Sequence, residues 1–152
     1  MTSETKASQT NQDLATACGQ QMYNRDQAAQ HMGIVVDGLA PGYAKLHMEI
    51  KPTMLSGHNF GHGGVTFLLA DTAFAYACNS HNVANVAHTC TITFSRPVNL
   101  GDTLTAVAQE AYKASKTGLY DVEITNQQGK TVAYFRGHSY SLNRPVLESS
   151  DA

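Results

Sequence analysis

The chain has 152 residues, of which 42% are hydrophobic, and this composition predicts one globular domain with a sizeable core. The net charge of −2 and the pI near 6.3 argue against nucleic acid as a partner, and no basic patch suggests a membrane surface. Cys18, Cys78 and Cys90 follow no metal-ligand spacing, which favours reduced thiols in a reducing compartment.

Both ends of the chain are polar. Residues 1–12 lack the apolar core of a signal sequence and are expected to form a disordered tail, so the sequence predicts a soluble cytoplasmic protein. Residues 143–152 are expected to form a second tail, which leaves 13–142 as the single domain. This domain should begin with an Ala- and Gln-rich helix, capped by Asn11 or Asp13 and ending near residue 33.

Strand patterns occupy most of the remaining domain. Residues 34–37 and 43–50 are joined through Pro41 and Gly42, and the second run alternates between apolar and polar residues, as in a hairpin with one wet face. Short turns between the later runs predict a meander of four antiparallel strands. These four runs cover residues 86–94, 102–112, 118–125 and 131–142.

The segment 62–79, between the two groups of strands, predicts a buried helix. Its residues are apolar on every side, which is typical of a helix surrounded by protein. Asp71 is a charged residue in its middle, and a buried carboxylate is costly unless it is paired, hydrated or used. Glycines at its start leave backbone N–H groups open to an oxyanion or a polarised carbonyl. One buried helix with a curved antiparallel sheet around it is an α+β architecture, the hot-dog arrangement.

The residues of this helix and its neighbours resemble a known family. The block Gly57-His58…Gly61-His62-Gly63-Gly64-x-x-Phe-x-Leu-Ala-Asp71 is similar to the signature of hot-dog acyl-CoA thioesterases of the phenylacetate-degradation type. Further matches are Thr91-Ile-x-Phe94-x-Arg-Pro97, Gly101-Asp-Thr-Leu-Thr-Ala106, Thr117-Gly-x-Tyr-Asp-Val-Glu-Ile124 and Phe135-Arg-Gly137. The resemblance covers residues 20–140. It implies hydrolysis of an aryl- or hydroxyaryl-acetyl-CoA, without metal or organic cofactor, by a homodimer or a dimer of dimers.

The residues themselves, together with the resemblance, suggest roles for several groups. The Gly63 N–H would polarise the thioester carbonyl, and Asp71 would either attack it or deprotonate a water. His62 would fix the loop or line the thioester pocket. The other expected substrate contacts are Ser56, which stands where the family usually carries Asn, His58, Gly64, Phe94, and, for the phosphates of coenzyme A, Lys113, Lys116 and Arg136.

The spacing of Gly63 and Asp71 indicates whether one chain can form a complete site. Eight positions on one helix correspond to about 12 Å of rise and about 80° of rotation, whereas reacting atoms must approach to roughly 3 Å. One helix therefore cannot bring its own Gly63 and Asp71 to the same carbon. An antiparallel copy of the helix across a two-fold axis can, so the sequence predicts sites shared between subunits.

Several alternatives stay open at this point. Asp71 could be a structural carboxylate, and His58 and His62 have a spacing that zinc sites use, although the surrounding glycines disfavour a continuous helix there. Cys78 or Cys90 could carry an acyl group, but neither has a sequence neighbour that would lower a thiol pKa. The competing functions are a hot-dog enoyl-CoA hydratase or dehydratase, which needs a His with Glu or Asp in one pocket, and a non-catalytic acyl-CoA-binding module.

Overall fold

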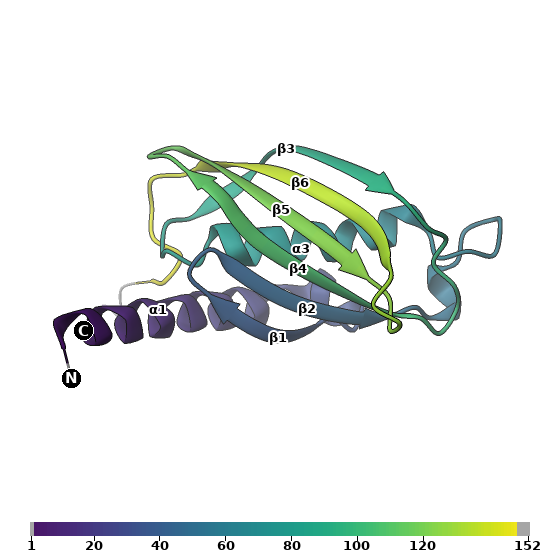
Figure 1. Cartoon of the computed structure of the whole chain (residues 1–152), viewed down its shortest axis with the longest axis horizontal. Helices are drawn as coiled ribbons and strands as arrows, with labels where there is room; N and C mark the ends of the chain where they lie inside the picture. The colour runs from purple at the N-terminus through teal and green to yellow at the C-terminus, as the bar shows by residue number, and fades with distance from the viewer. Residues whose placement is uncertain (1, 149–152) are drawn as a thin grey trace.

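A computed structural model describes residues 2–148 of the chain, and its six strands form one antiparallel sheet (Figure 1). The elements are α1 (Ser3–Arg25), α2 (Gln27–His31), β1 (Val35–Ala40), β2 (Tyr43–Glu49), the short 3₁₀ helix η1 (Pro52–Met54), α3 (Gly63–Cys78), β3 (Asn85–Phe94), β4 (Thr103–Lys113), β5 (Thr117–Thr125) and β6 (Thr131–Ser141). No helix among these residues combines the length and the apolar character needed to cross a membrane.

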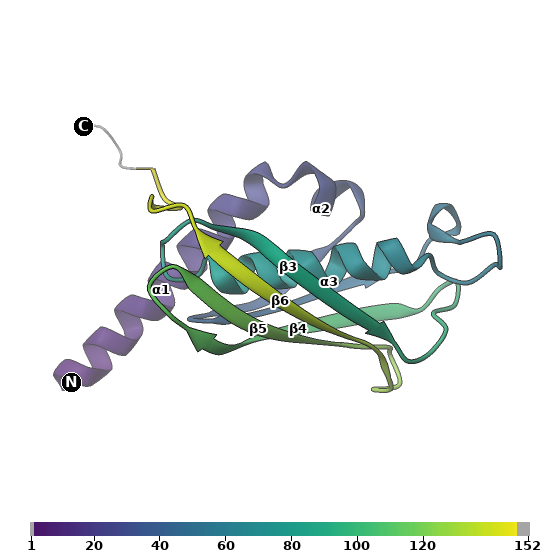
Figure 2. The same ribbon diagram turned by 90° about the horizontal axis from the view of Figure 1, so that it is seen from above.

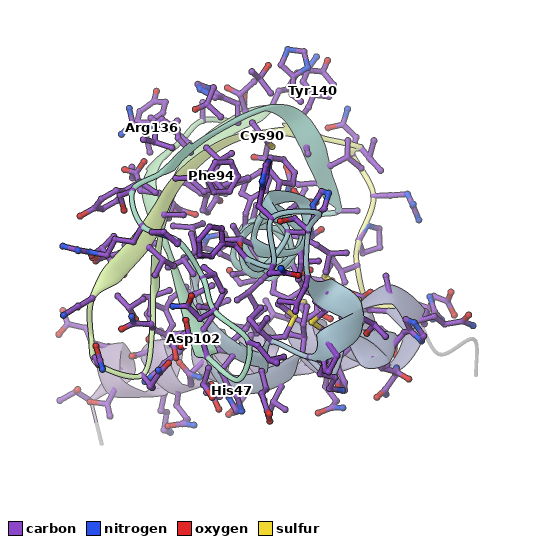
Figure 3. All side chains as sticks on the ribbon, turned by 90° about the vertical axis from the view of Figure 1, so that its right-hand side faces the viewer. His47, Cys90, Phe94, Asp102, Arg136 and Tyr140 are labelled. Atoms are coloured by element: carbon purple, nitrogen blue, oxygen red, sulfur yellow. The ribbon has the colours of Figure 1, made fainter. Side chains whose placement is uncertain are left out.

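The sheet curls around α3, which runs along its concave side, as the end-on view in Figure 3 shows. Nine residues of α3 are buried, and they lie on most sides of the helix because its sequence has no polar stripe. The Phe74 ring packs between Tyr120 of β5 and Phe135 of β6. Its centroid lies 5.6 Å from that of the Tyr120 ring and 5.8 Å from that of the Phe135 ring. The predicted hot-dog arrangement of one buried helix and one curved sheet is confirmed.

The strand order corrects one prediction. The sheet runs β1-β2-β4-β5-β6-β3, so only β4, β5 and β6 form a meander, and β3 pairs with β6 instead of β4. The connection from β3 to β4 is too long for a tight turn, and it crosses the end of the sheet near the start of α3. Val98 in this connection accepts a hydrogen bond of 2.7 Å from the Gly61 N–H. The crossing therefore holds the loop that precedes α3.

The N-terminal helix also differs from the prediction. α1 begins at Ser3, not at residue 11 or 13, and it projects beyond the sheet in Figure 2. Residues 3–11 are exposed and contain neither Pro nor Gly, so nothing in them stops a solvated helix. The helix then breaks at Asp26, whose Oδ1 accepts from the Ala29 N–H at 2.9 Å and caps α2.

Part of the predicted C-terminal tail packs on the domain. The Oδ1 of Asn82 accepts hydrogen bonds from the backbone N–H groups of Val146 and Leu147, at 3.1 and 2.9 Å. The Ala84 N–H also donates to the Arg144 carbonyl at 2.8 Å. The rest of that tail, residues 149–152, and residue 1 of the predicted N-terminal tail lie outside the described residues.

Candidate active site

The start of α3 is fixed by backbone contacts on both sides of its first turn. The His62 N–H donates to the Met54 carbonyl at 2.8 Å, and the loop between them closes through a bridge between Leu55 and Gly61. His62 is the N-cap of the helix, and its Nδ1 accepts from the Gly64 N–H at 2.9 Å. An accepting Nδ1 carries no proton, so the neutral ring has its N–H at Nε2.

The N–H of Gly63 is left free by this arrangement. Within residues 2–148 it donates to no acceptor, whereas the next N–H is taken by His62. A free N–H at the first helical position points along the positive end of the helix dipole. It is the kind of group that stabilises negative charge on a substrate oxygen.

A cleft of about 350 Å³ opens beside Gly63. A Cβ placed on Gly63 would lie 3.1 Å from Cζ of Phe94, so this ring packs directly against the helix start. Phe94 is 53% exposed and lies on the helix side of the sheet (Figure 3). The cleft is lined by Phe60, Gly61, Gly63, Thr66, Phe94, Ser95, Arg96, Pro97 and Val98. The predicted residues Gly63 and Phe94 are thus brought together.

Asp71 lies two turns further along α3 and is half-buried. Burial raises the pKa of its carboxyl group above the usual range. It forms no ion pair or side-chain hydrogen bond within residues 2–148, so its carboxylate is not used as a structural group there. Burial, and then the nearby Asp71 charge, raises the pKa of the Cys78 thiol to about 12 and also raises the pKa of Cys90. Both cysteines are therefore poor nucleophiles.

The loop residues named as substrate contacts lie outside the cleft. The Ser56 hydroxyl accepts a long hydrogen bond of 3.4 Å from the N–H of His58, and neither residue lines the space beside Gly63. Gly64 is exposed, and its N–H is occupied by His62. A role for these three residues toward substrate stays a prediction.

The predicted basic contacts do not line the cleft beside Gly63. Arg136 lies on the outer face of the sheet (Figure 3), where its Nε and Nη2 donate to Asp121 at 2.6 and 3.0 Å. Lys113 and Lys116 lie at the turn between β4 and β5, where Lys113 lines a much smaller cavity. Arg96 is the basic residue that the structure places in the cleft. The sequence contained a signal for it, since Arg96 stands between the matched Phe94 and Pro97.

No metal site is formed by the residues of this region. Among residues 2–148, no three side chains of His, Cys, Asp or Glu gather closely enough to hold an ion. His58 and His62 also do not share a helix, because α3 begins at Gly63.

Comparison with known proteins identifies the family. A model described as the Thioesterase superfamily matches residues 58–133. The chain is also 52% identical over 125 residues to acyl-coenzyme A thioesterase PaaI of Escherichia coli, which covers 82% of this chain and 89% of that protein. This chain belongs to the thioesterase superfamily. The expectation drawn from the resemblance is confirmed, and the matched residues of this thioesterase include Gly63, Asp71 and Arg96.

Solved structures agree with this assignment. The thioesterase superposes on the E. coli PaaI protein from the phenylacetic acid degradation operon with a TM-score of 0.87 and 48% identity, covering 88% of this chain and 97% of that one. A mutant of the phenylacetic acid degradation protein PaaI from Thermus thermophilus gives a TM-score of 0.75 and 36% identity, covering 77% and 100% of the two chains. The hot-dog fold is therefore shared with both.

Proposed function

We propose that this thioesterase hydrolyses an aryl- or hydroxyaryl-acetyl-CoA to the free acid and coenzyme A in the catabolism of phenylacetate. The observation that carries the proposal is the free Gly63 N–H at the start of a buried helix, facing a cleft that Phe60 and Phe94 line. Aromatic walls suit an aryl group, and a cleft with few polar groups is typical of a small-molecule site. The similarity to PaaI of E. coli supports this substrate class.

The Gly63 N–H would act on the thioester oxygen. This oxygen gains negative charge when the carbonyl carbon is attacked, and a preorganised N–H at a helix start stabilises that charge without reorganising. His62 contributes by occupying the Gly64 N–H and holding the first turn in place. The N–H that remains open is therefore the one that faces the cleft.

Asp71 would supply the attacking group in one of two ways. In the first, its carboxylate is the nucleophile: a bond forms from its oxygen to the acyl carbon, the C–S bond breaks and water later hydrolyses the mixed anhydride. Alternatively, a water attacks while its proton passes to the carboxylate. Both routes consume one water and release the acid and the thiol. A carboxyl group with a raised pKa suits the base role, because it holds a proton more readily.

A homodimer would complete each site. Gly63 and Asp71 of one chain are eight positions apart on α3, about 12 Å along the axis, so they cannot act on one carbon. β3 is an edge strand of ten residues, and within residues 2–148 it pairs only with β6. A long open edge favours pairing with a second copy. Such a pair would set two α3 helices side by side, with Gly63 of one near Asp71 of the other. We further propose that two such dimers associate.

Arg96 would hold a phosphate of coenzyme A. It is exposed at the cleft and forms no ion pair within residues 2–148, in contrast to Arg136, which is paired with Asp121. A guanidinium group binds phosphate through two parallel hydrogen bonds. Lys113 and Lys116 remain secondary proposals for the same role.

The free thiols of all three cysteines support a cytoplasmic location, where coenzyme A esters are found.

Thiol release from phenylacetyl-CoA, followed with a thiol-reactive dye, tests this function. Hydration of an enoyl-CoA in the same preparation tests the alternative enzyme. A hydratase needs a histidine together with a carboxylate in one pocket, and the cleft lining contains no histidine, while the pair His81–Glu110 lies beyond the other end of α3. We therefore expect thiol release without hydration. Tight binding of acyl-CoA without release of thiol would instead indicate a binding module.

A further inference from the structure

We propose that the Thr66 hydroxyl is a second hydrogen-bond donor to the thioester oxygen, beside the Gly63 N–H; this inference rests on the proposed function. Thr66 is only 2% exposed, and it lines the same cleft as Gly63 and Phe94. A buried hydroxyl normally has a hydrogen-bond partner within the protein.

The Thr66 hydroxyl has no such partner within residues 2–148. Thr72 shows the usual arrangement in a helix, since its hydroxyl donates to the Leu68 carbonyl at 2.7 Å. For Thr66 the corresponding acceptor is the His62 carbonyl, which already accepts from the N–H groups of Val65 and Thr66 at 2.9 and 3.3 Å. The Thr66 hydroxyl forms no hydrogen bond within residues 2–148, although Thr66 is more deeply buried than Thr72.

The direction of this hydroxyl follows from the packing. Every fully buried side-chain nitrogen or oxygen in residues 2–148 has a partner. An unpaired Thr66 oxygen must therefore contribute to the small exposed surface of its residue, and that surface opens onto the cleft. The hydroxyl is aimed at the space that a substrate would occupy.

Helix geometry places this hydroxyl close to the Gly63 N–H. Residues three apart are neighbours on one face, and helical side chains lean toward the N-terminus, so Thr66 covers the turn that Gly63 begins. The neighbouring walls of the cleft, Phe60, Phe94 and Val98, offer no donor. The two donors thus converge from one helix turn beside these apolar walls, whereas the other polar side chains of the cleft, Ser95 and Arg96, come from the segment after β3.

The chemistry requires no proton transfer from threonine. When the acyl carbon is attacked, the carbonyl π electrons move onto the oxygen, and both donors stabilise the resulting charge. When the C–S bond breaks, the electrons return and the thiolate leaves. The Thr66 proton stays on its own oxygen throughout. The hydrogen bond from Thr66 to the thioester oxygen strengthens as the negative charge develops, so loss of the hydroxyl should lower mainly kcat.

The test compares Thr66→Val with Thr66→Ser. Valine keeps the shape and removes the hydroxyl, and we expect kcat for phenylacetyl-CoA to fall about 10- to 100-fold while KM changes less than about threefold. Serine keeps a hydroxyl and should remain within about threefold of the native enzyme. Thr72→Val is the matched control, since it removes a buried helical hydroxyl that the cleft does not contain, and it should keep native kcat. Equal melting temperatures of the Val and Ser variants exclude misfolding as the cause.

A spectroscopic measurement separates this role from a structural one. The probe is a ketone analogue of phenylacetyl-CoA, with CH₂ in place of sulfur and ¹³C at the carbonyl. Loss of a donor should move its bound infrared carbonyl band to higher wavenumber in Thr66→Val, and not in Thr66→Ser or Thr72→Val. An unmoved band, or native kcat in Thr66→Val, overturns the inference while the proposed function stands. A native protein that releases no thiol from any acyl-CoA overturns the proposed function itself.

Discussion

The Nδ1 atom of His62 accepts a hydrogen bond of 2.9 Å from the Gly64 N–H, one residue beyond the N–H that faces the cleft. A side-chain acceptor at an N-cap typically contributes about 1 kcal/mol to stability. We expect His62→Ala to lose about this amount in urea unfolding, and His62→Asn to lose less, because an Asn side chain also caps helices. Equal losses in both variants would show that the imidazole acts through another contact.

The Asp71 carboxylate should make opposite contributions to activity and stability. Burial raises the pKa of Asp71, so the fold favours the protonated acid, and the charge present at neutral pH destabilises the folded state. Asp71→Asn removes this charge. We expect it to raise the melting temperature at pH 7, with the gain disappearing as the pH falls below the usual carboxyl range. Turnover should be abolished in both Asp71→Asn and Asp71→Ala.

The pH dependence of turnover by the native enzyme tests whether Asp71 acts in its ionised form. Either mechanism uses the ionised carboxylate, so kcat should fall as the pH drops through the raised pKa of Asp71. The midpoint of this acidic limb should lie above that of an ordinary aspartate. Native activity in Asp71→Asn would remove Asp71 from the mechanism, whereas a lower melting temperature of this variant at pH 7 would contradict the destabilising effect of its charge.

Much of the fold could be predicted from the sequence, because burial leaves a clear pattern. The apolar run of α3 predicted the central helix, and the lone Asp71 within it marked a candidate reactive group whose role stays a prediction. The pairing of β3 with β6 could not be predicted, because an alternating pattern identifies a strand but not the neighbouring strand with which it pairs. The connection of eight residues between Phe94 and β4 is long enough to cross the end of the sheet, but in the sequence its length is also compatible with a turn between neighbouring strands.

The site was harder to predict, because its walls come from distant segments. Arg96 reaches the cleft only because the crossing after β3 packs on the loop before α3, where the Gly61 N–H donates to Val98. Spacing alone does not distinguish it from Lys113 or Arg136. The extension of α1 to Ser3 was missed for a different reason: a polar segment without Pro or Gly has the composition of both a solvated helix and a tail.

Close packing between β6 and α3 allows a direct test of the core. A Cβ on Gly137 would lie 2.9 Å from three carbons of the buried Phe74 ring. We expect Gly137→Ala to destabilise the protein by about 1–3 kcal/mol through overpacking, measured by urea unfolding. Gly57→Ala is the control, because nothing lies within 4 Å of its added carbon, and it should change stability by less than about 0.5 kcal/mol. Equal effects would contradict the packing described for α3.

The first turns of α1 should contribute little to the domain. Residues 3–11 are exposed, whereas the helix is held from Gln12 onward, whose Nε2 donates to the Leu39 carbonyl at 2.6 Å. We expect deletion of residues 1–10 to change the free energy of unfolding by less than about 0.5 kcal/mol and to leave turnover unchanged. A large drop in melting temperature would show that this segment packs against the rest of the protein.

Sharing of each site between two chains is tested by mixing two inactive variants. Gly63→Val places side-chain carbon against Phe94 and blocks the N–H, and we expect a loss of about 100-fold or more in kcat. Asp71→Ala removes the carboxylate. If each site takes Gly63 from one subunit and Asp71 from its partner, a mixed dimer contains one intact site and one with both defects.

The two variants are unfolded and refolded together, and native mass spectrometry confirms that mixed dimers form. Random pairing makes about half of the dimers mixed, and each has one good site of two, so about a quarter of native turnover should return. Each variant refolded alone should remain inactive. A mixture that contains the mixed dimers and stays as inactive as its components would place Gly63 and Asp71 of a single chain in each site and contradict the shared site.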